Sequence, residues 1–350
     1  MSTAEYTREA APGQAPTELP ARGWRARFAL DALRYPVAPM ANRVPYMLGG
    51  LTFFGILLLV ATGVLLDQFY NPAPLGAHDS VVYIVTRVPL GWWLRALHYW
   101  GASLVLVSVF LHLVWTFSRR SYRAPREVQW WSGVLLLLLL FAIAFTGTVL
   151  RGDQEGGEAL AHAVAGGSLV GPVGAPVSPD FAPSTSLLAR VHNAHVSLLP
   201  LALLALIALH FWLVRWLGIH TAEARTSTFA RHLRRLGGFA LLLYGAISIL
   251  AALAPPRLGY PAVEGVEVTK PFWPFLWIYT FENTLGMTGM IVAPLVVFGA
   301  LAIVPLVDRR PDAAGGRPRW IVAAAVAFLA LFLGTLLYGA VAPQIAHLGM

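Results

Sequence analysis

Residues 94–117 read LRALHYWGASLVLVSVFLHLVWTF, and residues 187–217 read LLARVHNAHVSLLPLALLALIALHFWLVRWL. Each stretch is long and apolar enough to cross a bilayer as a helix, which takes roughly 20 apolar residues. Each also carries histidines, although ionisable side chains are costly inside a membrane and usually serve a function there. The two stretches therefore predict membrane helices that carry an intramembrane site.

The whole chain shares this apolar character. Of its 350 residues, 57% are hydrophobic and only 12% are charged, against about 25% charged residues in a soluble domain. Five further apolar runs lie at 46–66, 130–150, 237–254, 286–307 and 320–342. The sequence excludes a soluble globular protein and predicts an all-α, polytopic membrane bundle of about seven transmembrane helices. We divide it into a cytoplasmic tail (1–45), a four-helix front part (46–217), a cytoplasmic linker (218–236) and a three-helix rear part (237–350).

The basic residues indicate how the bundle lies in the membrane. The net charge is +8, and arginines gather before the first apolar run and within 119–126, 225–235 and 309–319. The other segments between apolar runs carry few basic residues. Because basic loops stay on the cytoplasmic side, we expect the N-terminus in the cytoplasm and the C-terminus outside, in a bacterial cytoplasmic membrane. This grouping between apolar runs argues against nucleic-acid binding.

The histidine spacing predicts two metal-binding levels. His98 and His112 are 14 residues apart, and His195 and His210 are 15 apart. Each pair therefore returns to one helix face, within about 40° and 60° respectively, at levels roughly 21 Å apart. Since both helices run inward, His98 shares the outer level with His195, and His112 shares the inner level with His210. His192 lies on the same face as His195 and is an alternative ligand.

Two crossed imidazole pairs favour haem over a bare ion. A porphyrin needs only two axial ligands from facing helices and packs well inside an apolar bundle. The chain has no cysteine, which excludes thiolate ligands and thioether attachment. The sequence thus predicts two non-covalent haems with His98, His112, His195 and His210 as iron ligands.

Glycines repeat with the same 14-residue spacing in the apolar runs 46–66 and 130–150. Gly49 and Gly63, like Gly133 and Gly147, are 14 residues apart, so they match the histidine levels. A residue without a side chain lets a flat macrocycle approach the backbone. Taken alone, however, these glycines are explained more simply by ordinary close packing of membrane helices.

Two arginines are candidate partners for haem propionates at the membrane edge. Arg95 precedes His98 by one turn, and Arg126 lies near the inner end of its helix, where a contact with lipid headgroups is an equal alternative. The remaining histidines fall in predicted loops or near the C-terminus, where a solvated surface position is expected. They are His78, His162, His220, His232 and His347.

Several short motifs around these residues resemble the cytochrome b/b6 family, the membrane subunit of bc-type quinol-oxidising complexes. They are ATG at 61–63, WLRALH at 93–98, PRE at 125–127, SGV at 132–134, HVSLLP at 195–200 and HFWLVR at 210–215. The resemblance is strong over about residues 40–220 and weaker to about 340.

This resemblance implies a low-potential haem outside, held by His98 and His195, and a high-potential haem inside, held by His112 and His210. It also implies quinol as substrate, oxidised near the outer haem. The implied partners are a Rieske-type iron–sulfur protein, a c-type cytochrome or equivalent, and membrane lipid. A homodimer is compatible with the family.

The chain departs from the family at the outer quinol site. Residues 271–274 read PFWP where the family has Pro-Glu-Trp-Tyr, so the usual proton-accepting glutamate is absent, and residues 151–153 read RGD in place of Pro-Trp-Gly or Pro-Trp-Asp. Asp153, Glu155 and Glu282 are candidate substitutes, although helix-end solvation or loop hydrogen bonds explain each of them separately. Met47 stands where photosynthetic members have a cysteine, so no covalent c-type haem is expected.

We therefore interpret the chain as a dihaem electron-transfer subunit of a quinol:cytochrome c oxidoreductase complex, with electrons crossing from the outer to the inner haem. It is expected to act within that complex and not as an enzyme alone. An alternative is a haem relay with a degenerate outer quinol site that serves another redox subunit. A haem-free structural or transport bundle is a third interpretation, disfavoured by the lack of carboxylate chains along the helices.

Overall fold

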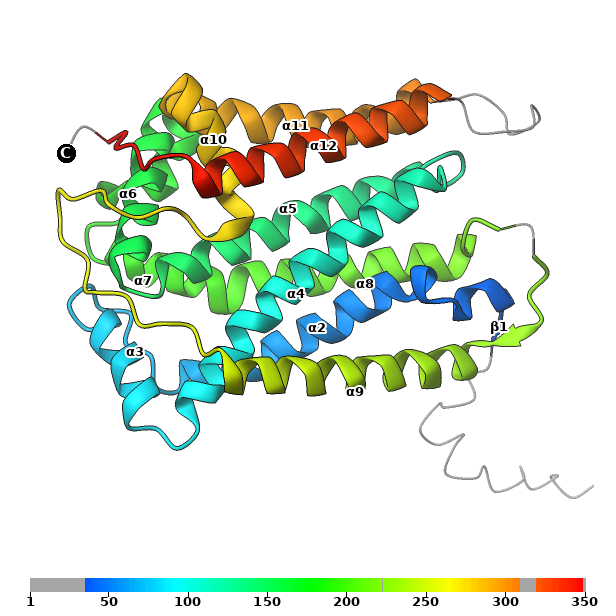
Figure 1. Ribbon diagram of the computed structural model, residues 1–350, viewed down its shortest axis with the longest axis horizontal. Coiled ribbons are helices and arrows are strands. Elements are labelled where there is room, and N and C mark those ends of the chain that lie inside the picture. Colours follow the sequence, from blue (N-terminus) through cyan, green and yellow to red (C-terminus); the bar gives the residue numbers. More distant parts are fainter. Residues whose placement is uncertain (1–34, 222, 309–318, 349–350) are drawn as a thin grey trace, which may run out of the picture.

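The computed structural model describes residues 35–221, 223–308 and 319–348. Most of the predicted tail, residues 1–34, lies outside this range. Within it, seven segments are long and apolar enough to cross a membrane. They are α2 (Val44–Asp67), α4 (Gly91–Ser118), α5 (Glu127–Val149), the continuous segment Leu187–Leu217, α9 (Phe229–Leu253), α11 (Met287–Val307) and α12 (Arg319–Val341). The predicted all-α membrane bundle is confirmed, and its long helices run side by side (Figure 1).

The outward faces of these helices remain apolar. Leu241 and Leu242 on α9, for example, expose 71% and 72% of their surface. A water-soluble protein rarely exposes apolar patches of this extent, whereas hydrocarbon chains solvate them well. The bundle therefore relies on lipid to cover its outer surface.

The front part consists of two helix pairs. Helix α2 packs along α4, and α5 packs along α8 (Leu199–Leu217), the last part of the fourth span. The pairs meet in one buried apolar layer, to which all four helices contribute. This layer consists of Ile56, Val105, Leu106, Leu140, Leu203 and Ile207.

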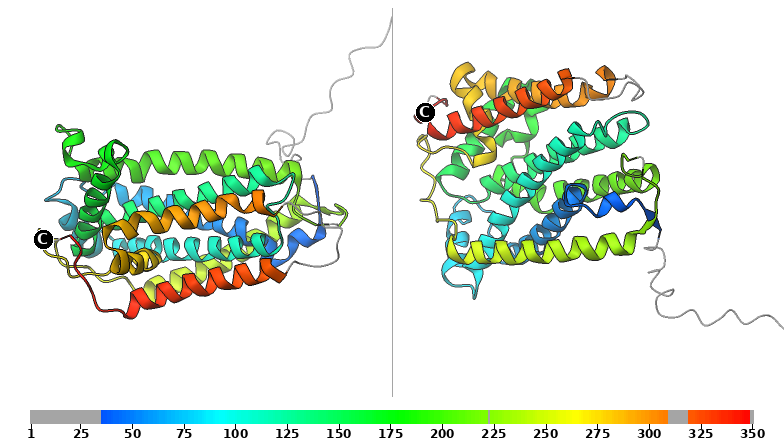
Figure 2. Two further views of the ribbon diagram at one scale, coloured as in Figure 1. Left: turned by 90° about the horizontal axis from the view of Figure 1, so that it is seen from above. Right: turned by 45° about the vertical axis from the view of Figure 1, so that its right-hand side comes forward.

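Helices α11 and α12 lie along one side of the bundle, next to α5 and α4 (Figures 1 and 2). The indoles of Trp130 and Trp131 on α5 donate hydrogen bonds to the carbonyls of Leu301 (2.7 Å) and Ala302 (2.8 Å) on α11. Because these donors would otherwise be unsatisfied in an apolar interior, the bonds fix α11 against the front part.

A buried ionic cluster ties the end of α11 to the loop between α4 and α5. The carboxylate of Asp308 is 1% exposed and receives hydrogen bonds from Arg120, Arg123 and Tyr122. Its distances to the two guanidinium groups are 2.7 and 2.6 Å. A carboxylate can be buried here because several donors replace its water.

Short elements gather at the two ends of the bundle. One end holds α3 (Ala77–Thr86), α6 (Gln154–Leu169), η3 (Gly171–Val177), η4 (Pro179–Phe181), η6 (Trp273–Phe275) and α10 (Leu276–Leu285) (Figure 1). At the other end, η2 (Pro39–Asn42) follows β1 (Pro36–Val37), which pairs antiparallel with β2 (Ser227–Thr228) just before α9.

Residues 151–186 and 255–285 join membrane helices, and their glycine and proline content is typical of long loops, but they contain helices in the structure. Helix α6 begins where the Asp153 side chain accepts a hydrogen bond from the backbone N–H of Gly156 (3.1 Å). Such an N-cap offsets the poor helix propensity of a glycine-rich sequence. Contacts of α6 with α5 and α11, and of α10 with α11 and α12, supply the remaining stability. The glycine and proline content therefore misled the prediction in these two segments.

Candidate functional site

Each of the four predicted ligand histidines lies against one of the four repeated glycines. The contacts pair Gly49 with His112, Gly63 with His98, Gly133 with His210 and Gly147 with His195. A Cβ atom would lie 2.9, 3.1 and 3.2 Å from Cε1 of the facing ring at Gly147, Gly49 and Gly63, which is closer than ordinary contact, and 3.6 Å away at Gly133. The glycines therefore make room for imidazole rings between paired helices, which is a more specific role than ordinary helix packing.

Three of these rings each form a hydrogen bond with a hydroxyl group on the neighbouring helix. The Nδ1 atoms of His98, His210 and His195 lie 2.9, 2.8 and 3.0 Å from the side-chain oxygens of Thr62, Ser132 and Thr146 respectively. Each hydroxyl donates its own hydrogen to a carbonyl of its helix, so it accepts a hydrogen bond from the imidazole N–H. Nδ1 thus carries the hydrogen, and Nε2 keeps a free lone pair, as metal binding requires.

Sequence reasoning missed these hydroxyl residues, although a signal is present. Each of them directly precedes a repeated glycine, as Thr62-Gly63, Ser132-Gly133 and Thr146-Gly147. The fourth glycine, Gly49, follows Leu48. Accordingly, the buried Nδ1 atom of His112 has no hydrogen-bond partner among the described residues.

The two histidines of the first level, His98 and His195, face each other across the two helix pairs. The ring centres of His98 and His195 are 6.4 Å apart, with an interplanar angle of 67°. Imidazole nitrogens bind metals at about 2 Å, so two axial rings on one metal have centres roughly 6 Å apart. At the other level, the rings of His112 and His210 lie against Gly49 and Gly133 respectively. The residues present therefore fit a bis-imidazole metal centre.

The apolar layer that joins the helix pairs lies midway between the two levels. Val105 is halfway between His98 and His112, Ile56 is halfway between Gly49 and Gly63, and all of this layer is buried. The structure thus separates the two histidine levels by one closed layer of side chains.

A π-helical turn explains the unequal histidine spacing. The fourth span runs as α7 (Leu187–Asn193), η5 (Ala194–Leu198) and α8, and η5 is π-helical. A π-turn accommodates one extra residue, so the 15-residue spacing of His195 and His210 becomes equivalent to the 14-residue spacing on α4. Pro200 follows at the start of α8, where its missing N–H is tolerated.

His192 has a different environment from His195. Its Nε2 atom lies 2.7 Å from Oδ1 of Asp67, and its ring stacks on Tyr70 at 5.3 Å. This side chain is held at the end of α2, whereas His195 faces His98.

The two candidate arginines contact backbone carbonyls at the ends of the bundle. Arg95 donates to the carbonyl of Pro256 (2.9 Å), and Arg126 donates to the carbonyl of Leu217 (3.2 Å). Arg126 also approaches the carbonyl of Gly218. Both guanidinium groups therefore hold a connecting segment beside a histidine helix.

The prediction of solvated surface positions was wrong for three histidines. The side chains of His78, His162 and His347 are only 17%, 15% and 7% exposed. His78 bonds to the carbonyl of Gly259 at 2.9 Å. His162 on α6 and His347 both approach Glu267 in the segment before α10. These contacts join residues far apart in sequence, so local patterns did not reveal them.

The three candidate proton acceptors have distinct surroundings. Asp153 caps α6 and lies 2.6 Å from Arg151, which also pairs with Glu155. Burial raises the pKa of Glu155 above its ordinary value, and the charge of Arg151 opposes this shift only in part. Glu282 on α10 is 4% exposed and faces His162 at 3.3 Å.

The PFWP segment, residues 271–274, contacts α4 beside the level of His98 and His195. Phe272 packs on Tyr99, the residue after His98, with ring centres 5.5 Å apart. The indole of Trp273 donates to the hydroxyl of Ser103 at 3.1 Å. An apolar ring thus stands beside α4 where the family has a carboxylate.

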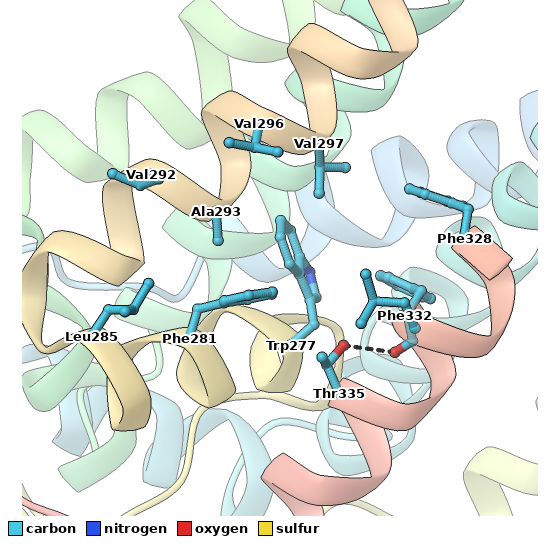
Figure 3. Close-up of a pocket in the computed structure, with 11 residues that line it drawn as sticks. Trp277, Phe281, Leu285, Val292, Ala293, Val296, Val297, Phe328, Phe332 and Thr335 are labelled. Carbon is cyan, nitrogen blue, oxygen red and sulfur yellow. Dashed lines mark hydrogen bonds between the residues drawn. The ribbon is translucent and has the colours of Figure 1, made fainter. Parts of the chain in front are cut away.

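A separate apolar cavity of about 150 Å³ lies between α10, α11 and α12 (Figure 3). Trp277, Phe281, Phe328 and Phe332 point into it, and Thr335 bonds to the carbonyl of its own helix. With no charged group in its lining, this cavity suits hydrocarbon and not proton transfer.

Comparison with known proteins identifies the family. The model of the family Cytochrome b/b6/petB matches residues 33–218. The cytochrome b subunit of the cytochrome bc complex of Chlorobaculum thiosulfatiphilum is 32% identical over 313 residues, covering 80% of this chain and 70% of the relative. The chain belongs to the cytochrome b/b6 family. This membership implies b-type haem and electron transfer in quinol oxidation.

Other relatives agree. The cytochrome b subunit of the menaquinol:cytochrome c reductase of Geobacillus thermodenitrificans is 37% identical over 183 residues, covering 50% of this chain and 80% of the relative. A solved structure titled hyperthermophilic respiratory Complex III covers 93% of this cytochrome b and 90% of its own chain, with a TM-score of 0.76 and 23% identity. The solved structure therefore shares the fold of both the front and the rear parts of this chain.

Proposed function

We propose that this cytochrome b carries electrons across the membrane between two b-type haems in a quinol:cytochrome c, or equivalent, oxidoreductase complex. His98 and His195 would hold the outer haem, and His112 and His210 would hold the inner haem. The observation that carries the proposal is the facing of His98 and His195 at 6.4 Å, each with Nδ1 fixed by a hydroxyl. When bound, the haems supply one-electron carriers at two depths.

The protein's own contribution is to position ligands and exclude water. The hydroxyls of Thr62, Ser132 and Thr146 hold the imidazole tautomer that presents Nε2 to a metal. Gly49, Gly63, Gly133 and Gly147 keep the helix pairs close enough for this contact, and the layer around Val105 keeps the two levels dry. Arg95 and Arg126 would pair with propionates.

The assignment of sides and units follows the basic residues. We place the N-terminus, the linker 218–236 and the inner haem on the cytoplasmic side, and the C-terminus, α6 and α10 outside. In this arrangement, residues 46–217 form the haem-binding unit and residues 237–350 the rear unit. A Rieske-type protein and a c-type cytochrome or equivalent would receive electrons at the outer end, and electrons would cross from the outer to the inner haem.

Glu155 is the carboxylate best suited to accept a proton from quinol in place of the family glutamate. It lies in the first turn of α6, directly after residues 151–153, the second altered motif. Burial raises its pKa, and a proton acceptor is most effective when its pKa approaches the working pH. Asp153 is used as a helix cap, and Glu282 faces His162 instead.

One observation favours a second function. Phe272 fills the place of the usual proton acceptor and packs against the central apolar layer. A subunit that only relays electrons between another redox protein and the quinone pool would keep its histidine sites and lose this carboxylate. In that case quinol would not reduce the outer haem.

The test is a dithionite-reduced minus oxidised spectrum with pyridine haemochrome quantification, on the wild type and on His98→Ala and His210→Ala. We expect two b haems in the wild type and the loss of one in each variant. Reduction by quinol in the complex supports quinol oxidation, whereas two haems that only dithionite reduces support the relay. Protein made with ample haem that binds none would refute both.

A further inference from the structure

A second cluster of metal-binding side chains lies apart from the histidine levels, at the end of the bundle where α6, α10 and the C-terminal segment meet (Figure 1). His162 comes from α6, Glu267 from the segment before α10, and His347 from the segment after α12. One ligand atom from each of these residues lies within 4.8 Å of the others. Three remote parts of the chain thus bring nitrogen and oxygen donors to one point.

The separations fit ligands of one metal better than hydrogen bonds. Nε2 of His162 lies 3.4 Å from Oε1 of Glu267, and Nδ1 of His347 lies 3.5 Å from the same oxygen. Hydrogen bonds between such atoms span 2.7–3.2 Å. Ligands bound at about 2.1 Å around a tetrahedral zinc ion lie roughly 3.4 Å apart.

The surroundings orient each donor toward this point. Nδ1 of His162 lies 2.7 Å from the carbonyl of Glu158, so it must carry the hydrogen, and Nε2 keeps its lone pair in the neutral ring. Oε2 of Glu267 accepts from the backbone N–H groups of His347 (2.8 Å) and Leu348 (3.0 Å), which leaves Oε1 for the cluster. Outer bonds of this kind are typical of metal ligands.

Buried polar atoms in the cluster lack partners among the described residues. Both ring nitrogens of His347, whose side chain is 7% exposed, form no hydrogen bond there, and neither does Oε1 of Glu282. That oxygen lies 3.3 Å from Nε2 of His162. Leaving such groups unsatisfied is costly, and a bound cation would remove this cost.

We propose that His162, Glu267 and His347 bind one zinc ion, with Glu282 beside His162 as a further oxygen donor. Two imidazoles and a carboxylate are the donor set zinc prefers, whereas magnesium and calcium prefer oxygen alone. The ion would fasten the C-terminal segment to α6 and to the segment before α10. This proposal is independent of the electron-transfer function.

The test uses the full chain in detergent, loaded with haem and purified without a histidine tag. After treatment with EDTA, the protein is equilibrated with buffered zinc chloride, and the bound zinc is measured by mass spectrometry. We expect the wild type to bind one equivalent of zinc more than Glu267→Gln and His347→Ala. The affinity for zinc should fall at least 10-fold in each variant, because even the loss of an outer partner of a metal ligand costs about 10–100-fold. Zinc should also raise the thermal unfolding temperature of the wild type, but not that of Glu267→Gln or His347→Ala.

Glu264→Gln is the matched control, because Glu264 lies in the same segment and is exposed. It should bind zinc like the wild type. The haem spectrum of each variant verifies folding, and Glu267→Gln keeps an acceptor for the backbone N–H groups. Wild-type protein that retains no extra zinc, or equal zinc in the wild type and both ligand variants, would overturn the proposal.

Discussion

The hydroxyl of Thr62 accepts a hydrogen bond from Nδ1–H of His98 at 2.9 Å and donates its own proton to the carbonyl of Leu58. The bond fixes both the tautomer and the orientation of the ring, because the hydroxyl has no second proton to offer. Ser132 and Thr146 repeat the arrangement for His210 and His195. Three of the four proposed haem ligands are thus prepared before any metal binds.

Replacing this hydroxyl should weaken the outer haem site. Thr62→Val keeps the shape of the side chain but leaves Nδ1 of His98 without its acceptor. Loss of such an outer partner typically costs 10–100-fold in metal affinity, so we expect outer haem to dissociate more readily in haem-transfer assays and its midpoint potential to shift. Thr52→Val removes a hydroxyl that bonds to Ser108 on the same helix pair, and it should change neither. Equal behaviour of the two variants would contradict the role given to Thr62.

The glycine contacts predict a graded response to alanine. The added Cβ would lie 2.9 Å from Cε1 of His195 in Gly147→Ala, but 3.6 Å from Cε1 of His210 in Gly133→Ala. The first contact forces the ring or the helix to move, while the second is an ordinary van der Waals distance. Haem quantification should therefore show loss of the outer haem in Gly147→Ala and near-normal content in Gly133→Ala. Gly237→Ala, whose Cβ meets nothing within 4 Å, should leave haem content unchanged.

The buried carboxylate of Asp308 should be important for stability. Asp308→Asn would remove the charge that balances Arg120 and Arg123, with which it pairs at 2.7 and 2.6 Å. Breaking a buried ion pair by changing one partner typically costs about 3–5 kcal/mol. Thermal unfolding should show a clearly lower midpoint for this variant, and a midpoint near the wild type for the exposed Asp180→Asn. An unchanged midpoint in Asp308→Asn would mean that the cluster adds little to stability.

The long membrane helices were readily predicted because each one needs an uninterrupted apolar run. All seven runs named from the sequence correspond to membrane-length helices. Sequence patterns did not indicate α6 and α10, because α10 has only 10 residues and α6 is rich in glycine. Their stability comes from the Asp153 cap and from tertiary contacts, which composition does not report.

Within the site, the pairing of histidines was foreseen, but its supporting groups were not. Helical spacing brings His98 and His195 to one level, and they do face each other. The extra residue before His210 required a π-turn, for which the sequence offered no rule. Burial of His162 and His347 depends on three segments meeting at one end of the bundle, and no local pattern encodes such a meeting.

Glu155 should make stability depend on pH in a defined direction. Burial, the largest influence, raises its folded pKa above the ordinary value, and Arg151 only partly opposes this. The folded chain then binds this proton more readily than the unfolded chain, so its contribution to stability is full below the unfolded pKa of about 4.3 and is lost as pH rises through the folded pKa. As pH rises across that window, the unfolding midpoint of the wild type should therefore fall relative to the midpoint of Glu155→Gln. A difference that stays constant with pH would show that the pKa of Glu155 is not shifted.

The same residue gives the sharpest test of quinol oxidation. A proton acceptor works only when deprotonated, so in the purified complex the rate should increase with pH through the raised pKa of Glu155. Glu155→Gln should remove this limb and reduce the rate by about 100-fold, the lower range for a lost acid–base group, without changing haem content. Glu264→Gln, an exposed acidic position, should keep the wild-type profile. If Glu155→Gln retains both the rate and the pH profile, the proton leaves by another route. Glu282 is then the next carboxylate to replace, because it is buried and its Oε1 lacks a hydrogen-bond partner among the residues described.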